Sequence, residues 1–351
     1  MREVAVISYA QTPMLRDAGR ANEVELLLPV INQVRDRVGV HQADIDFTCS
    51  GSCDYLQGAP FAFVSGVDAL GAVPPIKESH VEMDAAWALY EAWLKIQMGH
   101  ADTALIYGFG KSSPGELPTV LALQLDPYYV NPLWPDSISL AALQARAMLD
   151  EGVINETDMA AVVAGSRANA KQNSNAQLHG DYTVDQLLAE PTFVAPLRKH
   201  DCAPITDGAS AMIIASADKA RELCHRPAFI RGLDHRIETA HLGMRDLTKS
   251  PSTAKAGEKA GVHSAKIDIA ELHAPFSHQE IILKTALQLD DRVAVNPSGG
   301  ALAGNTMMAA GLDRIGEVAQ RIINGEAQRG VAHATSGACL QQNLVAVLEG
   351  E

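Results

Sequence analysis

Three side chains in this sequence have the chemistry of an acid, a base or a nucleophile. His273 follows the apolar run 267–272, and an imidazole with an ordinary pKa of about 6.5 suits proton transfer near neutrality. In such a place a histidine is also commonly a hydrogen-bonded core residue. Asp84 stands at the start of a helical pattern, where it is either an acid or base or a helix cap. Cys339 is either a reactive thiol or a small buried hydrophobic residue.

The composition disfavours several other kinds of site. Five cysteines have no paired spacing beyond Cys49-x3-Cys53, so we expect neither a disulfide framework nor a metal site. The run Gly108-Phe-Gly-Lys-Ser112 does not fit a phosphate-binding loop, because the first glycine of that motif would fall on Leu105. A formal net charge of -14 disfavours nucleic acid as a partner.

A chain of 351 residues with 47% hydrophobic residues can bury one large core or two smaller ones. No apolar run reaches the roughly 18 residues that a membrane-spanning helix needs. The start, Met1-Arg-Glu-Val-Ala-Val-Ile-Ser, enters a strand-like run without the features of a signal peptide. We therefore expect a cytoplasmic protein.

Short β-branched runs alternate with helical periodicity, which is typical of α/β architecture. In the first half we predict strands at 4–8, 46–49, 104–107 and 211–216 and helices at 22–39, 81–98, 137–151, 156–172 and 184–190. In the second half we predict strands at 228–232, 267–272, near 293, 331–333 and 344–348 and helices at 252–261, 279–289 and 303–323. The similar order in the two halves suggests a duplicated unit.

Four segments, in the correct order, resemble thiolase motifs. The run His80-Val-Glu-Met-Asp-Ala-Ala-Trp-Ala-Leu89, followed by 98–111, is similar to the nucleophile elbow and the next strand. Residues 202–211 resemble the hairpin that ends the first thiolase half, and Glu271-Leu-His-Ala-Pro-Phe276 resembles Glu-x-His-Asp-Cys-Phe of sterol-carrier-protein-2-type thiolases. Residues 296–311 and 333–338 are similar to the C-terminal catalytic loops. The chain is identified as a member of the thiolase superfamily.

The resemblance implies a thiolase fold, a five-layered αβαβα arrangement of two duplicated mixed-sheet halves. The implied N-terminal half is 1–217, with a short loop domain at about 112–200, and the C-terminal half is 218–351. The subgroup that the chain resembles is the thiolase-like lipid-transfer proteins of actinobacteria, some of which cleave steroid side chains as retro-aldolases. A homodimer is expected as in the family.

The resemblance also indicates what is missing. Thiolases hold an acyl group on a cysteine, but the nucleophile position falls on Ala85, or on Glu82 without a gap. Neither residue has a thiol. The second family cysteine would fall on Pro275 or on Gly337, with Cys339 close by, and Asn305 replaces the Gly-His-Pro histidine. Acyl transfer through the usual cysteine pair is therefore not expected.

What the family site retains suits a retro-aldol cleavage of a bulky, steroid-like 3-hydroxyacyl-CoA. His273 aligns with the motif histidine and would be the base, with Asp84 as a further acid or base. Asn305 could donate a hydrogen bond to the enolate, with further donors in the Ser336-Gly337 turn. Two alternatives stay open: residual acyl transfer or thiolysis through Cys339, and a non-catalytic lipid or acyl-CoA binding subunit.

No cofactor is expected beyond the CoA of the substrate itself, and no metal. Basic residues for its phosphates form no clear patch; the candidates are Arg198, Lys199, Arg231, Arg236 and Arg245. Aldolase-type relatives bind a zinc-ribbon and OB-fold partner. The resemblance therefore implies a heterotetramer with such a protein, which would help an acidic chain to bind an anionic substrate.

Overall fold

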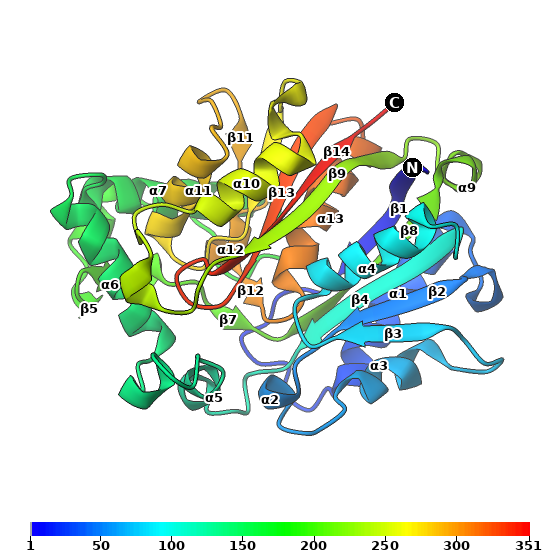
Figure 1. The fold of residues 1–351 in the computed structure, drawn as a ribbon, viewed down its shortest axis with the longest axis horizontal. Helices are drawn as coiled ribbons and strands as arrows, with labels where there is room; N and C mark the ends of the chain where they lie inside the picture. The colour runs from blue at the N-terminus through cyan, green and yellow to red at the C-terminus, as the bar shows by residue number, and fades with distance from the viewer. Residues whose placement is uncertain (1) are drawn as a thin grey trace.

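The computed structural model describes residues 2–351. Within that range ten strands form one mixed sheet, in the order β11-β10-β13-β14-β9-β1-β8-β4-β2-β3 (Figure 1). The strands are β1 (Val4–Gln11), β2 (Phe47–Gly51), β3 (Glu78–Val81), β4 (Thr103–Gly110), β8 (Gly208–Ser216), β9 (Ala228–Ile237), β10 (Ile269–Leu272), β11 (Ala294–Val295), β13 (Arg329–Ser336) and β14 (Gln342–Glu349). Two short pairs, β12 (Asn305–Thr306) with β7 (Ile205–Thr206) and β5 (Thr192–Val194) with β6 (Leu197–Arg198), lie outside it.

The two halves of the sheet repeat one strand order. Numbered by their appearance in each half, the strands run 3-2-4-5-1 both in β3-β2-β4-β8-β1 and in β11-β10-β13-β14-β9. The halves join where β1 pairs antiparallel with β9, at Ala5 with Phe229 and at Val6 with Ala228. The predicted duplication of two mixed-sheet halves is confirmed in the fold.

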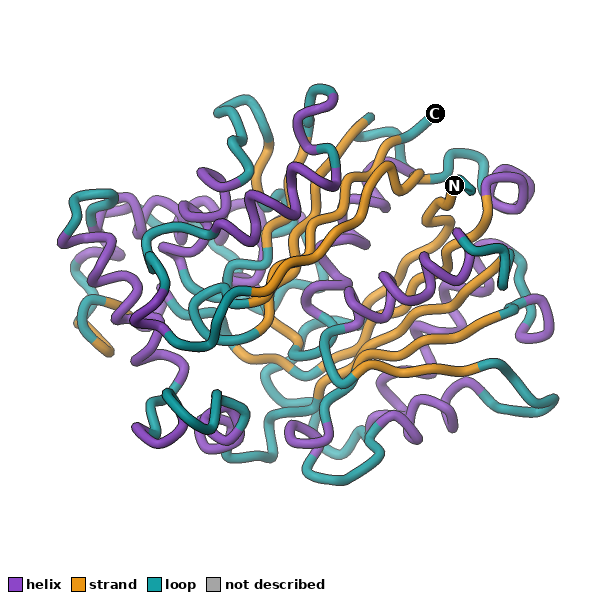
Figure 2. Tube along the Cα trace, viewed as in Figure 1, coloured by secondary structure: helices purple, strands orange, loops and turns teal. Residues whose placement is uncertain are grey.

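Helices form three layers around the two sheet halves. The central layer contains α4 (Ala85–Gln97) and α13 (Ala310–Ile323), which pack on each other and on both halves. On the outer side of the first half lie α1 (Glu23–Val38) and α3 (Phe63–Leu70), and on that of the second half α10 (Pro251–Ala260) and α11 (Ser277–Ala286) (Figure 2). This alternation is the predicted five-layered arrangement.

The first helix follows its sequence signals. Asn22 accepts a hydrogen bond from the Glu25 amide while the Glu25 side chain accepts one from the Asn22 amide, which is a capping box. Leu27, Val30 and further apolar residues at helical spacing face the sheet. Gly39 ends the helix with φ 63°, a conformation that glycine adopts without steric cost.

Two predicted helices are wrong at their starts. The helix expected at 81–98 begins at Ala85, because 78–81 pair with β2 as the edge strand β3. The helix expected at 303–323 begins only at Ala310, as α13; Gly304 to Ala309 separate it from the short helix α12 (Gly300–Ala303). This break packs so closely on β4 that a Cβ on Gly110 would clash with the Met307 carbonyl oxygen. The helix expected at 156–172 ends at Asn169 and continues as a 3-10 turn.

Residues 112–200 connect β4 to the strands that follow. They contain α5 (Leu117–Leu123), α6 (Ser137–Asp150), α7 (Glu156–Asn169) and α8 (Val184–Leu188) and project to one side of the sheet in Figure 1. The other helices are α2 (Asp54–Gln57) and α9 (Ala217–Leu223). None of the helices in residues 2–351 combines the length and the apolar character required to span a membrane.

Candidate active site

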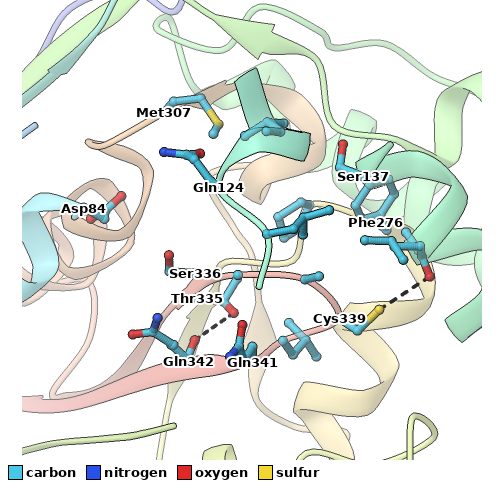
Figure 3. Close-up of a pocket in the computed structure, with 18 of the residues that line it drawn as sticks. Asp84, Gln124, Ser137, Phe276, Met307, Thr335, Ser336, Cys339, Gln341 and Gln342 are labelled. Carbon is cyan, nitrogen blue, oxygen red and sulfur yellow. Dashed lines mark hydrogen bonds between the residues drawn. The ribbon is translucent and has the colours of Figure 1, made fainter. Parts of the chain in front are cut away.

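A cavity of about 450 Å³ lies where the central helices, the 112–200 segment and the β13–β14 turn meet. Figure 3 shows side chains from these separate segments around it. All the predicted site residues except Ala85 line this cavity; they are Asp84, His273, Asn305, Ser336, Gly337 and Cys339. The fold therefore brings together residues that are as far apart as 84 and 339 in the sequence.

His273 and Asn305 form a hydrogen-bonded pair in the cavity wall. The backbone amide of Thr335 donates to His273 Nδ1 at 3.3 Å, so the ring proton is on Nε2. Nε2 lies 3.0 Å from Asn305 Oδ1 and donates to it. The oxygen of the Asn305 amide is thereby fixed, and this is the one hydrogen bond that the Asn305 side chain makes among residues 2–351. Asn305 thus has two N–H donors available at the cavity.

The expectation that His273 transfers protons near neutrality rested on an ordinary imidazole pKa, which its surroundings change. Burial, with smaller effects of His333 and Arg314, lowers the pKa of His273 to about 3. Its Nδ1 lone pair already accepts the Thr335 amide. The ring is therefore neutral, and its geometry makes it a donor that orients Asn305 rather than a free base.

Asp84 caps two helices at once. Its Oδ1 accepts from the Ala86 amide in α4 at 2.8 Å and from the Leu312 amide in α13 at 3.1 Å. Its Oδ2 accepts from the Gly311 amide at 2.8 Å. Burial raises the pKa of Asp84, and these three amides oppose that rise. The geometry is that of a cap, which was one of the two alternatives for this residue.

Ala85, where the sequence resemblance places the vacated nucleophile position, is not among the residues that line the cavity. Its amide donates to the Met308 carbonyl at 2.9 Å, and its side chain is fully buried. A Cβ on Gly108 would lie only 2.7 Å from the Ala85 Cβ, and one on Gly51 would clash with the Ala85 backbone. Tight packing therefore takes the place of a reactive group at this position.

Three cysteines line the cavity, and none is in the environment of a reactive thiolate. Cys339 donates to the Leu140 carbonyl at 3.4 Å, and burial raises its pKa to about 11. Burial also raises the pKa of Cys202 to about 12 and raises that of Cys53. Cys339 and Asp84 lie at opposite ends of the view in Figure 3.

The β13–β14 turn contributes Ser336 and Gly337 to the wall, the latter with φ 76°. Arg245 holds this turn in place by donating to the carbonyl oxygens of Ala338 and Cys339 at 3.2 Å and 2.5 Å. Whether the turn amides stabilise an oxyanion stays a prediction.

The basic residues considered for CoA phosphates do not converge on the site. Arg198 pairs with Glu156, Arg231 with Glu3, Arg236 with Asp234 and Arg245 with Glu238. No Lys or Arg lines the cavity within the described range 2–351. The chain alone therefore offers little positive charge at the cavity.

A buried polar network supports the wall behind His273. Arg314 in α13 donates to Glu271 Oε2 at 2.8 Å and to Ser298 Oγ at 2.7 Å. Asn296 accepts from the Leu272 amide and donates to Glu280 Oε2, each at 2.7 Å. These contacts fix the end of β10, where His273 begins the connection to α11.

Sequence reasoning missed the role of a backbone group. The Thr335 amide that sets the His273 tautomer has no side-chain signal, so only the register of β13 beside β10 reveals it. Gln124 was also missed; its side chain donates to Cys53 Sγ at 2.8 Å and lines the cavity. Its position after α5 gave no pattern that could have identified it.

No family model matches the chain. Among curated proteins it is 28% identical to an acetyl-CoA acetyltransferase of Methanocaldococcus jannaschii, over 91% of this chain and 89% of that protein. It is 26% identical to a 17-hydroxy-3-oxo-4-pregnene-20-carboxyl-CoA lyase of Mycobacterium tuberculosis, over 65% of this chain and 61% of the lyase.

Solved structures share the fold over the whole chain. The Ltp2-ChsH2(DUF35) aldolase superposes with a TM-score of 0.82 at 18% identity, covering 99% of this chain and 97% of that one. Human mitochondrial 3-ketoacyl-CoA thiolase superposes with a TM-score of 0.80 at 16% identity, covering 100% and 99%.

Proposed function

We propose that this protein catalyses a retro-aldol cleavage of a bulky 3-hydroxyacyl-CoA. The chain has the thiolase fold, and its relatives support a place in the thiolase superfamily. In this reaction the β-hydroxyl loses its proton and becomes a carbonyl while the Cα–Cβ bond breaks. The electrons of that bond form the enolate of a shortened acyl-CoA, which is then protonated at Cα. No covalent enzyme intermediate is needed.

The free amide nitrogen of Asn305 carries this proposal. An enolate places negative charge on the thioester oxygen, and a preorganised N–H donor in a water-poor site stabilises that charge. The hydrogen bonds from Thr335 to His273 and from His273 to Asn305 hold the amide oxygen against the imidazole, so that the amide N–H groups stay available to a ligand in the cavity that Asn305 lines. The cavity can thus stabilise an enolate even though it has no activated thiol.

The aldolase and lyase relatives support cleavage over acyl transfer as the reaction class. The name of the archaeal relative favours acyl transfer instead. This chain, however, has Ala85 at the position expected for the nucleophile, and the Cys339 thiol is occupied by its hydrogen bond to the Leu140 carbonyl oxygen. A steroid-like acyl group is proposed because most of the 117–141 wall is apolar. A cavity of this size is typical of small-molecule sites.

The test uses 3-hydroxy-3-phenylpropanoyl-CoA, which a retro-aldol reaction converts to benzaldehyde and acetyl-CoA. Asn305→Ala should lower kcat by about 10² to 10³ with little change in KM, the effect of removing one oxyanion donor. Asn32→Ala, on the exposed side of α1, is the control. If the unmodified chain instead transfers the acyl group and forms a covalent acyl adduct, the proposal is wrong and acyl transfer replaces it.

We also propose that a partner completes the site in a heterotetramer built on a homodimer of this chain. The Ltp2-ChsH2(DUF35) aldolase, which shares this fold, is named for two proteins and supports a site formed with a second chain. A zinc-ribbon and OB-fold protein could supply the positive charge that the cavity wall lacks. Large exposed apolar residues follow the cavity-lining part of α5 and offer a contact surface; they are Leu123, Tyr128, Tyr129, Leu133 and Trp134.

Size-exclusion chromatography with an OB-fold protein from the same gene neighbourhood tests the assembly. We expect a shift to two copies of each chain and a gain in cleavage rate. Full turnover and tight CoA binding by the chain alone would contradict the partner proposal without affecting the proposed reaction. Binding of acyl-CoA with no cleavage in any assembly would favour a non-catalytic binding subunit.

A further inference from the structure

The proposed cleavage, on which this inference rests, requires a group that accepts the proton of the β-hydroxyl. The two residues expected from the sequence do not supply it. His273 has a proton on Nε2 and an occupied lone pair on Nδ1. Asp84 receives three backbone N–H groups on its two oxygens and is buried between two helices. A different side chain must therefore act as the base.

The cavity-lining cysteines are also unsuitable as bases. Burial raises the pKa of Cys53, and it raises those of Cys202 and Cys339 to about 12 and about 11. Each of these thiols therefore retains its proton near neutrality. Among residues 2–351, the carboxylates that line the cavity besides Asp84 are Glu82 and Asp126.

Glu82 is held at the edge of the cavity by a fixed neighbour. It follows β3 and lies two residues before the double cap at Asp84. Its Oε1 accepts from the Asp54 amide at 2.6 Å, and Asp54 is itself anchored by accepting from the amides of Phe61 and Ala62. One oxygen of Glu82 is thus positioned by the backbone, and the carboxylate retains capacity to accept a proton.

The surroundings of Glu82 belong to the substrate cavity. Besides burial, the negative charge of Glu82 contributes to the raised pKa of the nearby Cys53 thiol, whose sulfur accepts a hydrogen bond from the Gln124 side chain. All three side chains line the cavity together with Asn305. Asn305 and Glu82 are therefore both available to a substrate bound in this one cavity.

Asp126 is the weaker candidate because its carboxylate already accepts hydrogen bonds from backbone amides of the turn that follows it. Its Oδ1 accepts from the amides of Tyr128 and Tyr129, and its carbonyl accepts from that of Asn131. This pattern is typical of an aspartate that caps a tight turn. Among the described residues, its carboxylate makes no hydrogen bond to another element of the cavity wall.

We propose that Glu82 is a catalytic residue, the general base of the cleavage. Its carboxylate takes the proton of the β-hydroxyl while the O–H electron pair forms the new C=O bond. The Cα–Cβ pair moves to the thioester as an enolate that Asn305 stabilises. The protonated Glu82 then returns the proton to Cα, which leaves an acyl-CoA and an ionised carboxylate.

Two assays test this role in the chain with its partner protein present. The first is cleavage of 3-hydroxy-3-phenylpropanoyl-CoA, and the second is exchange of the methyl protons of acetyl-CoA in D₂O, which does not depend on the carbonyl fragment. Glu82→Gln retains an acceptor for the Asp54 amide, so the local fold should persist. We expect both rates to fall by about 10² to 10⁴, the usual contribution of a general base, with KM nearly unchanged.

Glu91→Gln is the matched control, because it removes the same charge from an exposed position of α4. Its rates should equal those of the unmodified chain. Unchanged rates in Glu82→Gln would overturn the inference, as would a loss confined to Asp126→Asn. If the unmodified chain shows neither cleavage nor exchange, both the proposed function and this inference are refuted. If the unmodified chain is active in either assay, the proposed function stands, and the Glu82→Gln result then tests the role of Glu82 alone.

Discussion

The two halves of the molecule share a strand order but differ in what they do at the centre. Each half sends one helix into the central layer, α4 from the first half and α13 from the second. Asp84, whose carboxylate already accepts three backbone amides, caps α4, and Ala85, whose methyl group is tightly packed, is its first residue. The segment before α13 presents Asn305, whose amide nitrogen is free.

This difference teaches that a duplicated backbone does not duplicate chemistry. The N-termini of both helices direct N–H groups at one carboxylate, Asp84. The positive ends of their dipoles are thereby neutralised inside the protein and are not available to activate a thiolate. The donors for substrate then come from the second half, where hydrogen bonds orient Asn305 but do not saturate it.

The largest effect should come from the buried ion pair of the second half. Arg314→Met leaves Glu271 charged and unpaired in the core, which typically costs about 3–5 kcal/mol of the free energy of unfolding. Urea unfolding measures this loss. Lys255→Met, from an exposed pair with Glu258, is the control and should leave the midpoint unchanged.

A double variant sharpens this result. Arg314→Met with Glu271→Leu removes both charges, so it should recover much of the stability that the single variant loses. A single variant as stable as the original chain would show that the second half does not depend on this pair.

The second effect depends on pH and also lies in the second half. Burial raises the pKa of Glu280 from its ordinary 4.5 to about 7. The folded state therefore binds this proton more tightly than the unfolded state. The resulting stabilisation is complete below about pH 4.5 and is lost as the pH rises to about 7. Each pKa unit corresponds to about 1.4 kcal/mol, so the loss is about 3 kcal/mol.

Glu280→Gln mimics the protonated side chain and keeps an acceptor for Asn296. Relative to this variant, the original chain should lose stability between pH 5 and pH 8, measured as the difference in their free energies of unfolding at each pH. A difference that does not change with pH would contradict the raised pKa.

The third effect concerns the point where the halves meet. Asp84→Asn keeps one acceptor oxygen but places an NH₂ group against the Gly311 amide. An unpaired buried donor costs about 1–3 kcal/mol. Amide hydrogen exchange should show lost protection at the starts of α4 and α13 together. Asp136→Asn, which alters the cap of α6 alone, should affect one helix. Exchange confined to α4 would mean that the two helices are not coupled through Asp84.

Local signals in the sequence predicted most of the fold correctly. The capping box at Asn22 and the glycine at 39 allowed both ends of α1 to be predicted, because each signal depends only on residues adjacent in the sequence. The start of α13 could not be predicted in this way. The segment Asn305 to Ala309 leaves the helix because it packs on glycines of β4, which are distant in the sequence.

The candidate site was predictable in position more than in role. His273, Asn305 and Cys339, which sequence reasoning singled out, all line one cavity. The protonation state of His273 depends on a backbone amide of β13 and on burial, which sequence patterns do not report. The division at residue 217 and the loop domain at about 112–200 stay predictions.

The smallest effect is expected at Cys339, the thiol that an acyl-transfer reaction would have to use. Cys339→Ser keeps a donor for the Leu140 carbonyl, so activity should stay within a few-fold. Incubation with acetyl-CoA should leave no added acetyl mass, since a thiol with a pKa of about 11 has almost no thiolate near neutrality. Cys49→Ser, in the buried strand β2, is the control for loss of a cysteine alone. An acetyl group mapped to Cys339, abolished by Cys339→Ser and retained in Cys49→Ser, would restore nucleophilic chemistry to the second half. The halves would then differ because the nucleophile lies in the second half, at Cys339, and not in the first half, where Ala85 has no thiol.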